Sequence, residues 1–105
     1  MIKVTYFTHS KKAQKPEKTT IRIFEGKYFA QYDVAGKAEA TVKKMKEDGY
    51  KNVLYSRGQM IQLFSGKTEE EVLEIVQNDI KNGLLVAEDK TKDKLEIKDL
   101  VIERK

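Results

Sequence analysis

Apolar and polar residues alternate along much of the first third of the chain, and this pattern predicts three short strands. Ile2, Val4 and Tyr6 alternate with polar neighbours, which is the period-two pattern of a half-buried strand. Residues 20–24 and 28–32 repeat the alternation, and the Glu-Gly-Lys sequence between them is typical of a hairpin turn.

Two later stretches have the spacing of amphipathic helices. In the first, we expect Asp33 to cap the N-terminus and Gly49 to follow the last turn, because a carboxylate accepts from free amides and glycine adopts the left-handed backbone. The apolar stripe of this helix is expected to contain Ala35, Ala38, Val42 and Met45.

The second helix is predicted more sharply. Thr68 and Glu71 have the spacing of a capping box, the glutamates of the first turn oppose the helix dipole, and Gly83 is expected to end the helix. The expected buried positions are Val72, Leu73, Val76 and Ile80.

The remaining segments are assigned by shorter signals. Residues 52–56 and 60–64 are expected to form a hairpin, residues 84–86 a short strand, and residues 95–102 a final strand at a sheet edge, given its alternating charges. Residues 8–19 lack periodicity and contain four lysines and the only proline, which predicts a mobile basic loop. Residues 87–94 are expected to be a charged linker to the C-terminal strand.

A repeated heptad suggests how these elements are arranged. Residues 21–27 and 61–67 are identical at four of seven positions, and each is followed by a predicted helix or hairpin. Two strand-helix-strand units favour an α+β fold: a mainly antiparallel sheet with two helices on one face, in a ferredoxin-like pseudo-repeat with extra N-terminal and C-terminal strands. Phe24 and Phe64 would then occupy equivalent positions on neighbouring strands.

Length and composition limit the possibilities further. A chain of 105 residues with 39% hydrophobic residues has room for one domain, which we expect to span residues 1–105. The absence of cysteine excludes disulfides and thiol chemistry. No apolar run approaches the ~18 residues of a membrane span, and no secretory signal is recognisable, so we expect a cytoplasmic protein without membrane contact.

The motifs that carry catalytic chemistry are weak. Ser65-Gly66-Lys67-Thr68 resembles the end of a phosphate-binding loop, but Ile61 stands where the first glycine of that motif is required. His9 is the only histidine and has no orienting partner nearby in the sequence, and the carboxylate pairs lie in solvated, charge-rich stretches. We therefore expect no catalytic site, no metal and no cofactor.

Charge is distributed unevenly, and this changes the functional expectation. Residues 1–60 contain 13 Lys/Arg and 6 Asp/Glu, whereas residues 61–105 contain 8 and 11, and eight of the nine aromatic residues precede residue 56. A basic, aromatic-rich half is a feature of proteins that bind nucleic acid. It also arises because strands favour aromatic residues and lysines solvate the surface.

The candidate binding residues are cations of the basic loop and of the predicted sheet, together with aromatic residues on the strand face opposite the core. They are Lys11, Lys12, Lys15, Lys18, Arg22, Phe24, Lys27, Phe29 and Arg57, with Phe7 expected on the same face. Lysines neutralise phosphates and exposed aromatics stack on unpaired bases, so one hypothesis is a small binding module for single-stranded nucleic acid or RNA.

Two alternatives accompany this hypothesis. The same face is an apolar patch for a protein partner, as in an adaptor or a small inhibitor that docks on a nucleic-acid-handling protein. Otherwise, one of the terminal segments covers the face and leaves no site.

Overall fold

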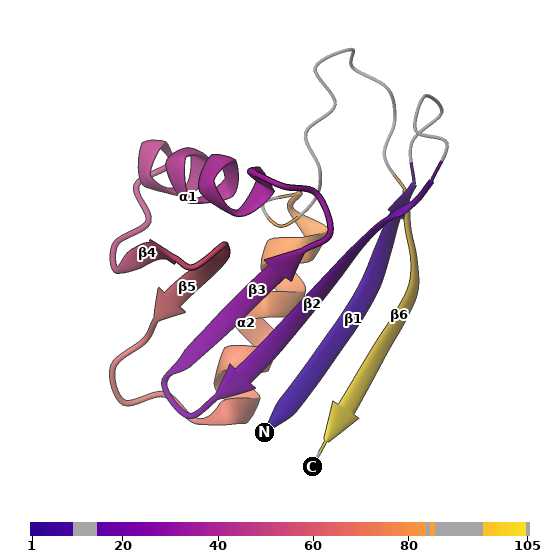
Figure 1. Cartoon of the computed structure of the whole chain (residues 1–105). Coiled ribbons are helices and arrows are strands. Elements are labelled where there is room, and N and C mark those ends of the chain that lie inside the picture. The colour runs from indigo at the N-terminus through magenta and orange to yellow at the C-terminus, as the bar shows by residue number, and fades with distance from the viewer. Residues whose placement is uncertain (10–14, 84, 86–95, 105) are drawn as a thin grey trace.

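The computed structural model describes residues 1–9, 15–83, 85 and 96–104, and in these ranges the chain forms one antiparallel sheet and two helices (Figure 1). The sheet order is β4-β5-β3-β2-β1-β6, and every neighbouring pair is antiparallel. Neither helix in the described ranges has the length and apolarity that a membrane crossing requires. The elements are β1 (Ile2–His9), β2 (Glu17–Phe24), β3 (Lys27–Tyr32), α1 (Lys37–Glu47), β4 (Val53–Ser56), β5 (Gln59–Leu63), α2 (Glu69–Lys81) and β6 (Glu96–Arg104).

Both helices cover the same face of the sheet, as predicted. α2 packs on β2 and β3, and α1 packs on β3, β5 and β4. The alternation in β1 directs Val4 and Tyr6, both without exposed surface, into the layer between sheet and helices. The predicted inner face of α2, including Val76 and Ile80, lies in this core. The α+β fold with two helices on one face of an antiparallel sheet is thus confirmed.

The ferredoxin-like pseudo-repeat is not confirmed, and the expectation for Phe24 and Phe64 is wrong. β2 and β5 lie on opposite sides of β3, so the two copies of the heptad are not neighbours. Across β3, Phe24 aligns through Lys27 with Leu63, one residue away from Phe64. Because side chains alternate along a strand, this shift of one residue places the two copies on opposite faces. Local sequence identity is therefore not structural equivalence here.

The start of α1 differs from the prediction. The residue at the N-cap is Gly36, in the left-handed conformation with φ 81°, and no side chain caps the helix. Asp33 instead extends the pairing of β2 and β3: its N–H donates to Lys18 O at 3.1 Å, and its carboxylate accepts from Lys18 N at 3.3 Å. Ala35 consequently lies before the helix and is exposed, rather than in the apolar stripe.

The predicted basic loop is shorter than residues 8–19. β1 continues to His9 and β2 begins at Glu17, and Thr8 and Thr19 are both buried on the core side. Paired strands persist there because β-branched threonines fit a half-buried sheet surface. Lys11 and Lys12, residues 84 and 86 of the expected short strand, and the expected linker at 87–94 lie outside the described residues.

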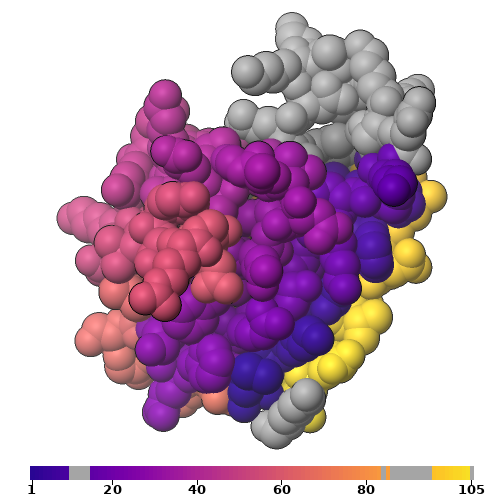
Figure 2. Space-filling model, in the orientation of Figure 1, coloured from indigo at the N-terminus to yellow at the C-terminus, as the bar shows by residue number. Residues whose placement is uncertain are grey.

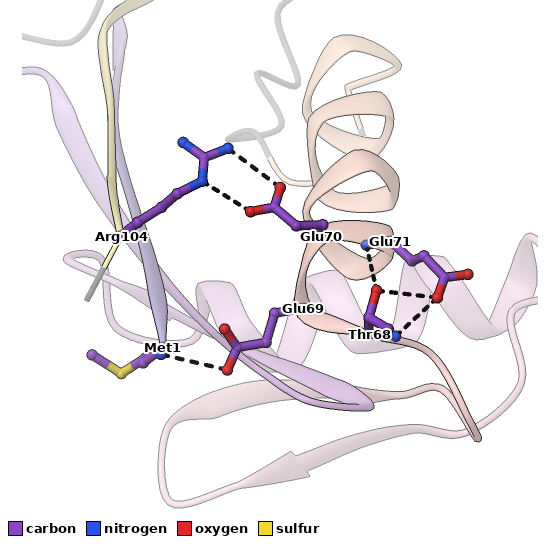
Figure 3. Close-up of polar contacts among 6 residues, drawn as sticks. All are labelled: Met1, Thr68, Glu69, Glu70, Glu71 and Arg104. Carbon is purple, nitrogen blue, oxygen red and sulfur yellow. Dashed lines mark hydrogen bonds and ion pairs between the residues drawn. The ribbon is translucent and has the colours of Figure 1, made fainter.

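The start of α2 is fixed by the predicted capping box and by contacts with both chain ends (Figure 3). Thr68 Oγ1 accepts from Glu71 N at 3.3 Å, and Glu71 Oε1 accepts from Thr68 N at 3.1 Å. Arg104 on β6 donates twice to the carboxylate of Glu70, at 2.9 and 3.3 Å, and the Met1 ammonium lies 3.4 Å from Glu69. These contacts join the first turn of α2 to the ends of β1 and β6.

Candidate functional site

The face of the sheet turned away from the helices, here called the outer face, carries the predicted aromatic and basic residues. Figure 2 views this face, with β3, β2, β1 and β6 side by side and no helix in front of them. The strand register aligns one outward-facing residue from every strand into a row across the sheet. From β6 to β4 this row is Glu103, Lys3, Arg22, Phe29, Ile61 and Leu54.

Phe24 and Phe29 form the aromatic centre of this face. Their ring centroids are 5.6 Å apart with an interplanar angle of 85°, which is a favourable edge-to-face arrangement. The Lys27 ammonium lies over the Phe29 ring, 5.6 Å from its centroid. Arg22 lies beside them and donates to Gln31 Oε1 at 3.3 Å. Four of the predicted site residues are therefore brought together.

Aliphatic side chains from β4 and β5 extend this aromatic centre. Leu54, Leu63 and Phe24 expose 49%, 38% and 36% of their surface, and Ile61 and Phe29 are half-buried. We call the set Phe24, Phe29, Leu54, Ile61 and Leu63 the outer patch. The three aliphatic members were not predicted as site residues.

β5 is inverted with respect to polarity. Met60 and Gln62 face the helices and are buried, with 0% and 3% of their surface exposed, whereas Ile61 and Leu63 face outward. The Gln62 side-chain amide donates to Lys51 O at 2.7 Å, but its Oε1 atom has no hydrogen-bond partner in the part of the chain that the structure describes. A shift of one residue would bury Ile61 and Leu63 and expose Gln62, but it would also expose Met60 and bury Gln59.

Local and long-range contacts hold β5 in this register. The β4–β5 turn has positive φ at both Arg57 (51°) and Gly58 (78°), which is the type I′ geometry that fixes a two-residue hairpin. At the other end, Phe64 N donates to Gly26 O at 2.7 Å, and the Phe64 ring packs on Tyr28 with centroids 5.8 Å apart. The inversion is thus imposed by the fold on a strand whose own pattern would allow either face.

The remaining predicted residues are more dispersed. Phe7 faces outward on β1 opposite Lys18, four residues along and two strands across from Phe29, so the two backbone positions are roughly 16 Å apart. Lys18 faces the same way and is exposed; Lys15 precedes β2, and Arg57 occupies the β4–β5 turn. The three phenylalanines do share a face, but only Phe24 and Phe29 form a contact.

His9 lies at the end of β1 rather than in a loop. It is half-buried, and its Nε2 atom has no hydrogen-bond partner among the described residues. No group of three or more His, Cys, Asp or Glu residues that could hold a metal ion occurs in the described ranges.

One buried carboxylate was missed by the sequence analysis. Asp79 on α2 is 4% exposed, and its two oxygens accept from Tyr28 Oη at 3.0 Å and Tyr50 Oη at 3.2 Å. Burial raises the pKa of Asp79, and the two hydrogen bonds oppose that rise. The group lies on the opposite side of the sheet from the outer patch, so we assign it to the core. The sequence did contain a signal for its burial: Asp79 follows Val72 by seven residues and Val76 by three, which places it on the buried face of the helix.

The terminal strands leave the outer patch uncovered. β1 and β6 continue the sheet edge to edge and do not fold over β2, β3 or β5. Within the described residues, the alternative that a terminal segment covers the face is therefore wrong.

Comparison with known proteins provides no identification. No protein-family model matches the chain, and no curated protein or solved structure matches it significantly.

Proposed function

We propose that the chain is a small non-enzymatic protein-binding module, an adaptor or inhibitor that docks its partner on the outer patch. The inverted polarity of β5 carries the proposal: Leu63 is 38% exposed while the adjacent Gln62 is 3% exposed. Exposing the Leu63 side chain and burying the Gln62 amide both cost free energy in the folded protein. Places where a local folding rule is broken are commonly places of function.

The composition of the patch favours a protein over other ligands. Five adjoining apolar side chains on one face exceed the isolated apolar residues that a monomer commonly exposes, and such patches mark protein interfaces. Arg22 and Lys27 border the patch, and Arg57 lies at the end of the neighbouring hairpin. A complementary partner surface would be apolar at its centre with acidic groups at its margin.

Single-stranded nucleic acid remains the second candidate, and one observation favours it. Phe24 and Phe29 lie on adjacent central strands with Lys27 and Arg22 next to them, which resembles an aromatic stacking platform with phosphate-neutralising cations. However, the Lys27 ammonium already occupies one side of the Phe29 ring, and the nearest further neighbours are aliphatic. Protein docking therefore accounts for more of the surface.

The experiment compares two variants of the same protein in affinity enrichment from extracts of the source cells, followed by titration of the purified partner. The double variant Ile61→Gln/Leu63→Gln removes two aliphatic side chains of the patch, and Val101→Gln, which replaces an exposed apolar residue on β6, is the control. We expect the first variant to lose the partner, with at least about tenfold weaker affinity, and the control to retain it. Equal retention by both variants would overturn the proposal.

A titration with labelled oligonucleotides tests the second candidate. If nucleic acid binds through this face, affinity falls log-linearly with salt, and Phe24→Ala weakens single strands by about 1 to 3 kcal/mol while duplex binding changes little. We expect instead no measurable binding to single-stranded DNA, RNA or duplex at low salt. Binding with that salt dependence and that response to Phe24→Ala would replace the protein-docking proposal by the nucleic-acid one.

A further inference from the structure

The two edges of the sheet differ, and the difference concerns strand addition. β6 is protected in the manner of natural edge strands: five of its nine residues are charged, its pairing with β1 has a register shift, and Asp99 has φ 58°. β4 is the opposite edge, and its sequence Val-Leu-Tyr-Ser has no charge, no proline and a continuous register with β5.

The ladder between β4 and β5 shows which backbone groups of β4 remain available. Leu63 N donates to Asn52 O at 3.1 Å, so the hydrogen-bonded positions of β4 are the even-numbered ones. Val53 and Tyr55 therefore direct their N–H and C=O groups away from β5, toward the open edge. Their spacing is that of the donor and acceptor pairs that an added strand uses.

The side chains beside this edge continue the outer patch. Leu54 is 49% exposed on the outer face next to Ile61, and Tyr55 is 47% exposed on the side of the helices. An added strand would place one of its side chains against Leu54 on the outer face. The residues before and after that one in the added strand would point to the helix side of the sheet. The outer patch and the open edge thus form one continuous surface.

Charge selects among the possible occupants. In antiparallel self-pairing through Val53 and Tyr55, Lys51 of each copy would come near Arg57 of the other, because these two residues flank the ends of β4. Like charges that are brought close together repel each other, which disfavours a second copy. The segment 37–63 as a whole contains six Lys/Arg and three Asp/Glu (Glu39, Glu47 and Asp48), so its charge favours an acidic partner.

We infer that β4 accepts an extended segment of a partner protein as a seventh strand, with an apolar residue opposite Leu54 and acidic residues near Lys51 and Arg57 at the two ends. Main-chain hydrogen bonds to Val53 and Tyr55 supply affinity, and the flanking charges and the outer patch supply specificity. This inference rests on the proposed function and specifies the shape and charge of the partner's docking segment.

The test is a selection of random heptapeptides displayed against the whole unmodified protein, after which the binding of the selected peptides to Tyr55→Pro is measured. Proline removes the outward N–H of Tyr55 without removing a bond to β5, and edge strands tolerate it. The matched control is Tyr55→Thr, which loses the ring but keeps the N–H and the strand preference. Folding of each variant is verified by circular dichroism.

We expect peptides with a central apolar residue and acidic residues near both ends. Tyr55→Pro and the charge-reversed variant Lys51→Glu/Arg57→Glu should each bind them at least about tenfold more weakly, and Tyr55→Thr less than about threefold. Peptides that bind Tyr55→Pro as well as the unmodified protein would overturn the inference. So would a self-association that Tyr55→Pro abolishes, because the occupant would then be a second copy.

The outcome is separable from that of the proposed function. A natural partner that is lost by Ile61→Gln/Leu63→Gln but retained by Tyr55→Pro docks on the outer patch without adding a strand, which overturns only the inference. A partner that binds Ile61→Gln/Leu63→Gln and Tyr55→Pro as well as the unmodified protein overturns the proposed function and the inference together.

Discussion

The hydroxyl group of Tyr28 on β3 donates a hydrogen bond to Asp79 on α2, with 3.0 Å between Oη and Oδ2. The bond lies in the layer between sheet and helix, and Tyr50 completes it from the segment before β4 by donating to Oδ1 at 3.2 Å. Three separate parts of the chain thus meet at one buried carboxylate. Satisfied polar groups of this kind hold a fold in one arrangement.

Tyr28→Phe should lower the free energy of unfolding at neutral pH by about 1 to 3 kcal/mol, because it leaves a buried carboxylate oxygen without its donor. Urea denaturation measures the change. Tyr55→Phe is the matched control, since Tyr55 is 47% exposed, and it should change the stability by less than about 0.5 kcal/mol. Equal effects of the two substitutions would contradict the assignment of Asp79 as a core hydrogen-bond acceptor.

The free energy of unfolding should depend on pH in part through the titration of Asp79. Its pKa is raised in the folded state by burial, so its contribution to stability is fully present below the unfolded value of about 3.9 and is lost as pH rises through the folded value. The stability of Asp79→Asn relative to the unmodified protein should therefore increase with pH. Denaturation at several pH values from about 4 to 8, with Asp48→Asn as an exposed control, measures this; a decrease with pH would contradict it.

Thr68→Ala should destabilise the protein by about 1 kcal/mol through loss of the cap at the start of α2, and Thr68→Ser should restore most of it. Ile80→Ala, on the buried face of the same helix, should cost about 2 to 5 kcal/mol. The thermal midpoint reports both. An unchanged midpoint for Ile80→Ala would show that the inner face of α2 has been misassigned.

Residues of the outer patch should matter little for folding. Leu54→Gln and Leu63→Gln should each change the free energy of unfolding by less than about 0.5 kcal/mol, because both side chains lie on the surface with more than a third of their area exposed. Met60→Ala, from the buried side of the same strand β5, should cost about 2 to 5 kcal/mol. A large loss of stability in Leu63→Gln would indicate that the patch serves folding and would weaken the docking proposal.

Arg57 offers a test of stability against binding. It adopts φ 51° at the first central position of a type I′ turn, where asparagine is favoured and other residues with a β-carbon are strained. Arg57→Asn should therefore stabilise the protein by about 0.5 to 2 kcal/mol. It should also weaken the binding of the acidic segment inferred to add to β4, because the positive charge is lost. Arg57→Lys, which keeps the charge, should retain binding without the gain in stability.

Much of the fold follows from short-range patterns in the sequence. Alternation identified β1 through Ile2, Val4 and Tyr6, and the spacing of Thr68 and Glu71 identified the start of α2, because both signals depend on neighbouring residues only. The first turn of α1 was predicted less well. Asp33 has the chemistry of an N-cap, but pairing with Lys18 on β2 holds it in the sheet.

In the candidate site, too, features set by neighbouring residues were predicted, and features set by contacts elsewhere in the fold were not. Phe24 and Phe29 were placed on the outer face correctly, since alternation in β2 and β3 agrees with their burial. In β5 the sequence Gln-Met-Ile-Gln-Leu allows either face, and the choice is made by the β4–β5 turn and by Phe64 packing on Tyr28. Ile61 and Leu63 were missed for this reason: the face that they occupy depends in part on Phe64 packing on Tyr28, a contact between residues distant in the sequence.

The unequal edges of the sheet have a consequence for valency. A β-sheet with two receptive edges can add copies at both ends and grow into a fibre. Here the charged, irregular β6 closes one end, so copies of the protein would not join the β4 edge of one to the β6 edge of the next. The protein would then bind one partner segment per chain and form a complex of defined stoichiometry in place of an open polymer.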